Sequence, residues 1–301
     1  MEIVGYEKKY CGDVIRCLKR NFKTMENLTD DYMEKWLCSL TEYSWQDDIP
    51  IELFPYKYGM VLIENDEVIG YCGLIYSKIE IDGHKLSYVN TTTWAIDAEY
   101  RLYVLKATKE MIKTADIVSD FSAIDSMEEM NRKMFKYRYL EQEIYKYLPS
   151  PAFSRKLKKR IIKREDEINT LSERNKYIDH LPYGVKCLKC ELDEDDCYVF
   201  YRRTYSKIKN INNVPYIQVL DVSNYRLLSD NLKEIVWYLA RKEKALFEID
   251  SRFLIKDLID SKPSKISKTH RQVRGSLPDT YVMSNLYSEM AILKQIRSPN
   301  L

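Results

Sequence analysis

Glycine is scarce in this chain, with 8 among 301 residues, where an average protein carries roughly 7%. Nucleotide sites of the Walker and Rossmann types depend on glycine-rich loops, because a residue without a Cβ lets the backbone approach a phosphate group closely. The sequence contains no such loop, which excludes both types of site.

Long apolar runs are also missing. No stretch approaches the ~18 consecutive apolar residues that identify a membrane-spanning helix. The residues from Met1 to Glu7 do not combine a basic region with a following apolar run, so we expect no signal peptide. We therefore predict a cytoplasmic protein with no membrane partner. The 7 cysteines agree, because an odd and scattered set suits a reducing compartment.

The chain has no excess of charge of one sign. Its 48 basic and 46 acidic residues leave a formal net charge of +2. Dedicated nucleic-acid-binding proteins carry a basic surplus, so we do not expect nucleic acid as a partner. The basic run from Arg155 to Arg164 is a local exception. Acidic residues follow it and its apolar residues are sparse, which predicts a solvated connecting helix over 151–176.

Histidine occurs 3 times, and one histidine belongs to a set with the chemistry of a zinc site. The set consists of His180, Cys187, Cys190 and Cys197. In a strand, Cys187 and Cys190 would point to opposite faces, because they are an odd number of residues apart. We therefore predict no metal, and we expect these cysteines to serve as small buried apolar residues.

A meander of strands is the clearest pattern that the sequence does contain. Apolar and β-branched runs at 60–63, 68–75 and 86–96 are separated by polar turns at 64–67 and 82–83. Such runs predict three antiparallel strands. Apolar residues then recur at helical spacing, at Val104, Leu105, Thr108, Met111, Ile112 and Ala115. The strands therefore lead into a helix through the corner at 97–101.

This corner carries a family resemblance. Ile69-Gly70-Tyr71 and Trp94-Ala95-Ile96-Asp97-Ala98-Glu99-Tyr100-Arg101 resemble the acyl-CoA-binding core of the GCN5-related N-acyltransferases, the GNAT superfamily. In that family a strand ending in a "V-x-peyR-x-x-G-x-G/A" motif opens the helix that holds the cofactor diphosphate. A helix N-terminus suits a diphosphate because its N–H groups and its dipole both favour an anion.

The resemblance implies acetyl-CoA as co-substrate and names the residues that would bind it. They are Trp94, Ala95, Ile96, Arg101, Leu102, Tyr103, Val104, Leu105 and Lys106. Arg101 matches the arginine of the motif, whereas Val104 and Lys106 stand where the family has glycines. We expect the N–H groups of residues 102–106 to remain available, and Lys106 to add positive charge.

The resemblance also implies direct attack of an amine on a thioester. Such an enzyme positions the reactants, takes a proton from the amine and stabilises the carbonyl oxyanion. On the last strand of the meander, Asn90, Thr92 and Trp94 are expected to share one face. None of them is a good base. A water held by Asn90 or Thr92, or the carboxylate of Asp120 on the next strand, would therefore take the proton.

A tyrosine protonates the departing thiolate in members of this family. The corresponding segment here runs from Met134 to Leu140, near the end of a helix predicted over 127–139. Tyr137 and Tyr139 are the candidates, and Phe135 is the alternative occupant of the family position.

The elements before the meander follow the family order, with a strand at 2–7 and a helix at 12–22. A second helix begins at Thr29-Asp30. In the family the loop beside that helix shapes the acceptor site. Trp45, Phe54 and Tyr56 therefore have two interpretations, as residues that line the acceptor site or as core packing.

The second half repeats this arrangement. Strands predicted at 185–192, 197–203 and 216–222 precede a helix at 228–240 and a strand at 245–250. We predict an α/β (α+β) fold with two GNAT-like domains, each a mixed, largely antiparallel sheet flanked by helices. The first domain would span 1–150 and a degenerate second one 177–301. Residues 285–290 resemble a "LYSE" segment of tandem members.

These observations favour an acetyl-CoA-dependent N-acetyltransferase whose acceptor is a small-molecule or peptide amine. Two alternatives stay open. One is a non-catalytic binding protein on the same fold, which the missing motif glycines favour. The other is a tRNA-dependent aminoacyl transferase of the Fem type, which only the basic run at 155–164 supports.

Overall fold

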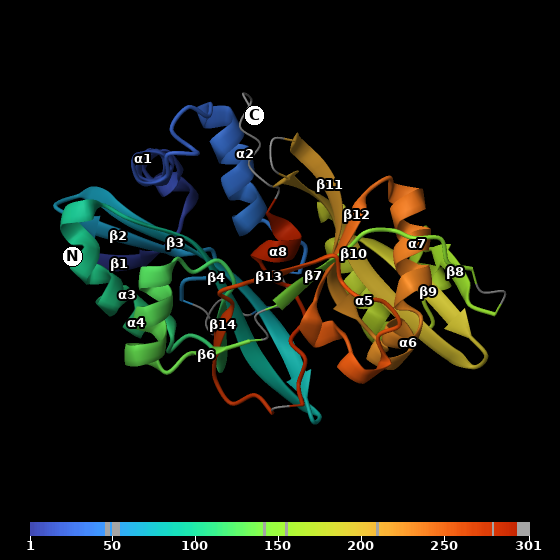
Figure 1. The fold of residues 1–301 in the computed structure, drawn as a ribbon. Helices are drawn as coiled ribbons and strands as arrows, with labels where there is room; N and C mark the ends of the chain where they lie inside the picture. Colours follow the sequence, from blue (N-terminus) through green and yellow to red (C-terminus); the bar gives the residue numbers. More distant parts are fainter. Residues whose placement is uncertain are drawn as a thin grey trace. The chain divides into compact units, whose positions relative to one another are not determined.

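The computed structural model describes residues 1–45, 49, 55–140, 143–153, 156–208, 211–278 and 280–293, with the backbone alone at 206–208 and 211–212. Phe54 and Arg155 lie outside the described residues. The chain divides into two compact units (Figure 1). Unit 1 contains residues 1–140, 270–281 and the described residues from Tyr287 onward, and unit 2 contains residues 141–269 and 282–286.

Unit 1 is built on a seven-stranded sheet with the order β1-β2-β3-β4-β5-β14-β6. The strands are β1 (Glu2–Gly5), β2 (Met60–Glu64), β3 (Glu67–Ile81), β4 (His84–Ile96), β5 (Ile117–Asp120), β14 (Gln272–Arg274) and β6 (Arg138–Tyr139). Only β4 and β5 run parallel, and every other pair is antiparallel. The predicted meander at 60–96 is therefore confirmed as β2, β3 and β4.

The helices of unit 1 cover both faces of this sheet (Figure 1). They are α1 (Cys11–Asn21), α2 (Asp30–Thr41), the 3-10 turn η4 (Ala98–Tyr103), α3 (Val104–Met111), α4 (Asp125–Phe135) and the short α8 (Glu289–Ile292). The predicted start of the second helix is confirmed, because the Thr29 hydroxyl caps α2 by accepting a hydrogen bond from the Tyr32 N–H.

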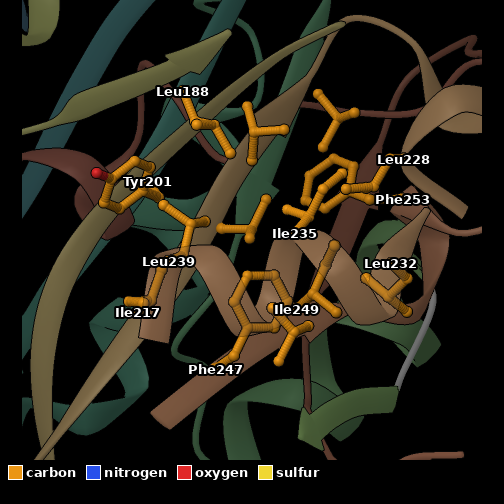
Figure 2. Packing of buried hydrophobic residues seen from close by; sticks show 14 of the residues in the cluster. Leu188, Tyr201, Ile217, Leu228, Leu232, Ile235, Leu239, Phe247, Ile249 and Phe253 are labelled. Carbon is orange, nitrogen blue, oxygen red and sulfur yellow. The ribbon is translucent and has the colours of Figure 1, made fainter. Parts of the chain in front are cut away.

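Unit 2 has its own seven-stranded sheet, with the order β13-β7-β12-β11-β10-β9-β8. Its strands are β7 (Glu143–Tyr147), β8 (Lys158–Ile161), β9 (Lys186–Leu192), β10 (Asp195–Ile208), β11 (Ile211–Val222), β12 (Leu246–Asp250) and β13 (Lys265–Lys268), and its helices are α5 (Leu171–His180), α6 (Tyr225–Asp230) and α7 (Leu232–Glu243). The apolar face of α7, with Leu232, Ile235 and Leu239, packs onto the sheet (Figure 2).

The two units share one topology. In unit 1, β3 and β4 are antiparallel and β4 then pairs in parallel with β5; in unit 2, β10, β11 and β12 repeat these relations. In both units the helical crossover between the parallel strands follows a meander. The predicted fold class, two mixed and largely antiparallel sheets flanked by helices, is confirmed.

The structure corrects several predicted elements. Residues 151–176 do not form one helix, because Lys158–Ile161 is the edge strand β8 and α5 begins at Leu171. Leu171, the first residue of α5, is exposed. Helix α4 ends at Phe135, where Lys136 takes a left-handed conformation, so Tyr137 and Tyr139 lie beyond it. The predicted helix at 228–240 is divided between α6 and α7.

Two short strands, β14 and β7, belong to other sheets than their place in the sequence suggested. Residues 262–274, where we predicted no strand, contain β13 and β14. Strand β14 pairs with β5 in unit 1, although it lies late in the sequence, and β7 pairs with β12 in unit 2. In the described part of the chain, no helix has both the length and the apolar character to cross a membrane.

Candidate functional site

A β-bulge interrupts β4 at the centre of unit 1. Gly73 of β3 pairs with Thr92, but Tyr71 pairs with Ala95, so β4 contains one extra residue in this interval. Thr93 has a positive φ of 56°, which is uncommon for a β-branched residue and marks the irregularity. The extra residue shifts the alternation of side chains between the two faces of the sheet. Ala95 therefore lies on the same face as Thr92, and our expectation that Trp94 lies on that face is wrong.

The pairing of the parallel strands β4 and β5 ends immediately before this bulge. Their last paired residues are Thr91 and Asp120. Glu289 from α8 lies at the opening: its Oε2 accepts hydrogen bonds from the hydroxyls of Thr92 and of Ser122, the latter at 3.1 Å. A carboxylate from the C-terminal segment therefore sits at the end of the β4–β5 ladder.

Asp120 is the second carboxyl group at this opening. It is 3% exposed, and its Oδ1 accepts the Ser122 N–H at 3.2 Å. Burial, and then the nearby charge of Glu289, raise the pKa of Asp120 to about 7. Asp120 was predicted as an alternative proton acceptor, whereas Glu289 was not. The "LYSE" segment was the one sequence signal near Glu289.

Asn90 holds the segment that carries Glu289. Its Oδ1 accepts the backbone N–H of Glu289 at 2.8 Å, and its Nδ2 donates to Ser119 Oγ at 2.9 Å. Ser119 in turn contacts the Tyr88 hydroxyl at 2.6 Å. Both ends of the Asn90 amide are thus engaged within the protein, which makes it a positioning residue at the site.

The two candidate tyrosines lie in different surroundings. Tyr137 is buried close to Asp120, and this burial raises the pKa of its phenol. Tyr139 is half-buried on β6, where its hydroxyl contacts Glu128 and accepts a hydrogen bond from Arg132 at 2.9 Å. The structure thus brings Tyr137, but not Tyr139, close to Asp120.

The corner predicted to bind the cofactor follows β4 directly. Arg101, Leu102 and Lys106 are exposed there, while Tyr103, Val104 and Leu105 are half-buried. Turn η4 runs into α3 without a break, and the Val104 N–H already bonds the carbonyl groups of Arg101 and Leu102. The expectation that every N–H from 102 to 106 is available is therefore wrong at Val104.

Asp97 fixes the start of this corner. Its carboxylate accepts hydrogen bonds from Arg20 Nη2 at 2.7 Å and from Asn21 Nδ2 at 2.7 Å. Both donors belong to the last turn of α1. These hydrogen bonds hold the start of the corner against α1. The exposed side chains of Arg101 and Lys106 follow on a backbone that is fixed at Asp97.

Two sets of residues have the chemistry of metal ligands. Cys190 and Cys197 are paired across β9 and β10 in the core of unit 2, and Cys187 lies outside that cluster, as strand alternation predicts. Within the described residues, the one group with metal-ligand spacing is Asp125, Glu128 and His270. Glu128 is already bonded by His270 and by Tyr139, so we interpret this group as an ion pair that ties residue 270 to α4.

Of the aromatic residues expected beside α2, Trp45 is part of the core and Tyr56 is half-buried. Trp45 is 4% exposed, donates to the Tyr76 carbonyl at 2.9 Å and packs edge-on against Tyr287.

A cavity of about 510 Å³ lies near the end of α2 in unit 1. Glu7 and Glu42 line it together with Lys8 and Lys57, so its charges balance.

Unit 2 closes the equivalent opening with an ion pair. Asp250 ends β12 as Asp120 ends β5, and it lies 3.5 Å from the guanidinium of Arg252. Asn285 donates from Nδ2 to Asp250 at 2.9 Å, and its backbone N–H bonds the Leu220 carbonyl. A neutralised carboxylate therefore stands in unit 2 where unit 1 has two carboxyl groups.

Comparison with known proteins supplies the fold family. No protein-family model and no curated protein matches the sequence. Among solved structures, GCN5-related N-acetyltransferases from Anabaena variabilis and Kribbella flavida both superpose with TM-scores of 0.54. Their identities are 9% and 12%, over 91% of this chain and 72% and 71% of theirs. A proposed acetyltransferase from Pyrococcus horikoshii gives a TM-score of 0.50 at 14% identity, over 99% of this chain and 95% of that one.

The chain has the GCN5-related N-acetyltransferase fold, once in each unit. The resemblance noted at residues 69–71 and 94–101 is thereby confirmed at the level of fold. In this GNAT fold, β4 with its bulge, β5 and the η4–α3 corner are contiguous, and the buried carboxyl groups lie at the point where β4 and β5 part.

Proposed function

We propose that this protein is an N-acetyltransferase that transfers the acetyl group of acetyl-CoA to an amine by direct attack. The supporting observation is the opening between β4 and β5, where the bulge at Thr93 and a buried group of proton acceptors occur together. Parallel strands that part in a sheet create a crevice in which a ligand can lie across the sheet. A thioester lying there would be next to groups able to take a proton from an amine.

The donor half of the proposal concerns the corner after β4. The exposed cations Arg101 and Lys106 would hold the diphosphate of acetyl-CoA, together with backbone N–H groups of residues 102–105 other than Val104. Thr93 and Trp94 have no partner in the β3 register, so a backbone N–H there would bind the carbonyl oxyanion. Ala95 and Ile96 would contact the cofactor arm along the same strand.

The acceptor half is an amine on a small molecule or a peptide, in the cytoplasm. A cytoplasmic location agrees with the cysteines, all 7 of which are free thiols. Asn90 and Thr92 would orient the residues that take the amine proton. Tyr137 would hydrogen-bond the departing thiolate, because its raised pKa keeps the phenol protonated.

Calorimetric titration of acetyl-CoA and of free CoA tests this function. We expect micromolar binding that Arg101→Glu abolishes, because the variant places a negative charge at the diphosphate. Arg16→Glu is the matched control, since Arg16 is an exposed arginine on α1. An acceptor screen with primary amines would follow. If neither ligand binds at millimolar concentration, the protein is not an acetyl-CoA enzyme.

The engaged N–H of Val104 favours a second candidate, a non-catalytic binding protein on the same fold. It predicts that no amine is acetylated even if CoA binds. The tRNA-dependent alternative is weakened, because the basic run is partly neutralised. Lys159 pairs with Glu234 at 2.9 Å, and Arg160 lies 3.5 Å from Glu167.

A further inference from the structure

Transfer of an acetyl group to an amine needs a proton acceptor, and neither the Asn90 amide nor the Thr92 hydroxyl is a base near neutral pH. Two carboxyl groups do meet at the opening between β4 and β5. Asp120 is 3% exposed and Glu289 is 6% exposed, so both are withdrawn from water.

We propose that Asp120 and Glu289 hold one proton between them in the resting protein, and that this pair takes up the proton lost by the attacking amine. The inference rests on the proposed function and deepens it by naming the proton acceptor. It also assigns a role to α8, whose first residue is Glu289.

Burial is the reason for the shared proton. Two buried carboxylates close together cannot both ionise without a large cost in solvation and repulsion. In unit 2, Arg252 neutralises the equivalent Asp250. Within the described residues, no lysine, arginine or histidine forms an ion pair with Asp120. In unit 1 a proton therefore neutralises one carboxylate of the pair, as the guanidinium of Arg252 neutralises Asp250 in unit 2.

Hydrogen bonds stabilise the single negative charge of the pair. Glu289 Oε2 accepts from the hydroxyls of Thr92 and Ser122, and such bonds favour the ionised form. Asp120 accepts the Ser122 N–H, but burial is the largest influence on it and raises its pKa to about 7. Glu289 is therefore the member proposed to carry the charge, and Asp120 the member proposed to hold the proton.

The proton and electron balance closes within the pair. The amine nitrogen attacks the thioester carbonyl, its N–C bond forms, and its proton passes to the Glu289 carboxylate. The C–S bond then breaks with its electron pair on sulfur, and the thiolate takes one proton from the doubly protonated pair. The products are an amide and free CoA thiol, and the pair returns to its starting state.

Among the described residues, the other titratable groups named around the pair are neutral or have partners of their own. Burial raises the pKa values of the Cys72 thiol on β3 and of the Tyr137 phenol. Two arginines of the returning segment are near: Arg274 donates to the Phe135 carbonyl, and Arg271 lies over the Phe121 ring. The buried side chains of α2 are apolar except Thr41. A titration near neutral pH at this place would therefore report the carboxyl pair.

Infrared difference spectroscopy of the full chain tests the shared proton without any ligand. We expect a protonated-carboxyl band that disappears with a midpoint near pH 7 and is missing in Asp120→Asn. Asp116→Asn is the matched control, because Asp116 precedes the same strand and is bonded to Ser87 at 2.6 Å. It should retain the band. If wild type lacks the band, no shared proton exists and the proposal is overturned.

Kinetics with acetyl-CoA and an amine test the role in catalysis. Glu289→Gln keeps the shape and can still accept both hydroxyl hydrogen bonds, so we expect it to fold. It should lower kcat about hundredfold and leave the calorimetric Kd for acetyl-CoA unchanged, as expected for loss of a base. Asp116→Asn should keep the wild-type kcat. A Glu289→Gln kcat within a few-fold of wild type would overturn the proposal.

The pH profile separates proton transfer from a structural role. In wild type, kcat should fall as the pH rises through the midpoint seen in the infrared titration, because the pair then loses the shared proton, and Asp120→Asn should shift or remove that step. If wild type binds no acetyl-CoA, the proposed function fails and so does the catalytic role of the pair. The infrared titration would then still show whether the proton is shared.

Discussion

Asn90 and Glu289 are joined across 199 positions of sequence: Asn90 Oδ1 accepts the backbone N–H of Glu289 at 2.8 Å. Asn90 has no exposed surface, and its Nδ2 is bonded to Ser119. One buried amide thus fixes the C-terminal segment to the middle of β4. The position of the Glu289 carboxylate depends on this bond.

Replacing Asn90 with alanine should release that segment. We expect a loss of about 2 kcal/mol in the free energy of unfolding, because a buried N–H and a buried hydroxyl each lose a partner. Hydrogen exchange measured by mass spectrometry should accelerate over residues 287–293. Asn231→Ala is the control, since it removes a bond to the Leu227 carbonyl in unit 2. Equal exchange over 287–293 in both variants would refute the bracing role of Asn90.

Much of unit 1 follows from local patterns in the sequence. The turns at 64–67 and 82–83 separate apolar runs of strand length, so β2, β3 and β4 were predicted correctly. The Thr29 cap likewise identified the start of α2. These signals depend on neighbours in the sequence, and they hold wherever the element lies in the fold.

The pairing of distant segments could not be predicted in this way. Strand β14 has three residues, and its partner β5 lies some 150 positions earlier by residue number. Glu289 reaches β4 from α8, which has only four residues and no helical period to detect. No sequence signal indicates the bulge at Thr93. Because the bulge adds one residue to β4, Trp94 does not lie on the face of the sheet that we predicted for it. The carboxyl pair therefore became visible only in the structure.

Asp120 should make unit 1 more stable at lower pH. Its folded-state pKa of about 7 lies above the ~3.9 of an unfolded aspartate, so the folded state binds more protons between these values. The contribution is complete below the unfolded pKa and is lost as the pH rises through 7, by up to roughly 4 kcal/mol. Hydrogen exchange of β5 amides at about pH 5 and about pH 8, corrected for intrinsic rates, measures it.

The neutral variant Asp120→Asn removes this dependence. It should protect β5 better than wild type at the higher pH and no better at the lower pH. Asp116→Asn is again the control, since hydrogen bonds from Ser87 lower the pKa of Asp116 and its titration lies well below this range. A wild-type protein with equal protection of β5 at both values would contradict the prediction.

His180 should give unit 2 the opposite dependence on pH. It has no exposed surface, its Nδ1 contacts the Lys176 carbonyl at 2.8 Å, and burial lowers its pKa from 6.5 to about 4. The unfolded state then binds more protons, so stability is present above 6.5 and is lost as the pH falls through 4. The loss is roughly 3 kcal/mol. After correction for intrinsic rates, exchange of α5 amides should accelerate below pH 6.5, and His180→Gln should reduce that acceleration, whereas His84→Gln, in unit 1, should not.

Asp97 supports the proposed cofactor corner through α1, and its removal should weaken acetyl-CoA binding without abolishing it. Arg20 and Asn21 both donate to Asp97, and η4 begins at the next residue. Arg20 is about half exposed, so the ion pair contributes little to stability, and we expect Asp97→Ala to cost about 1 kcal/mol. The Kd for acetyl-CoA should rise about threefold to tenfold, because the exposed cations of the corner lose their fixed base. Asp13→Ala breaks a comparable exposed pair with Arg16 elsewhere on α1 and should leave the Kd unchanged. If both variants bind acetyl-CoA as wild type does, the diphosphate is not held at the corner that Asp97 anchors.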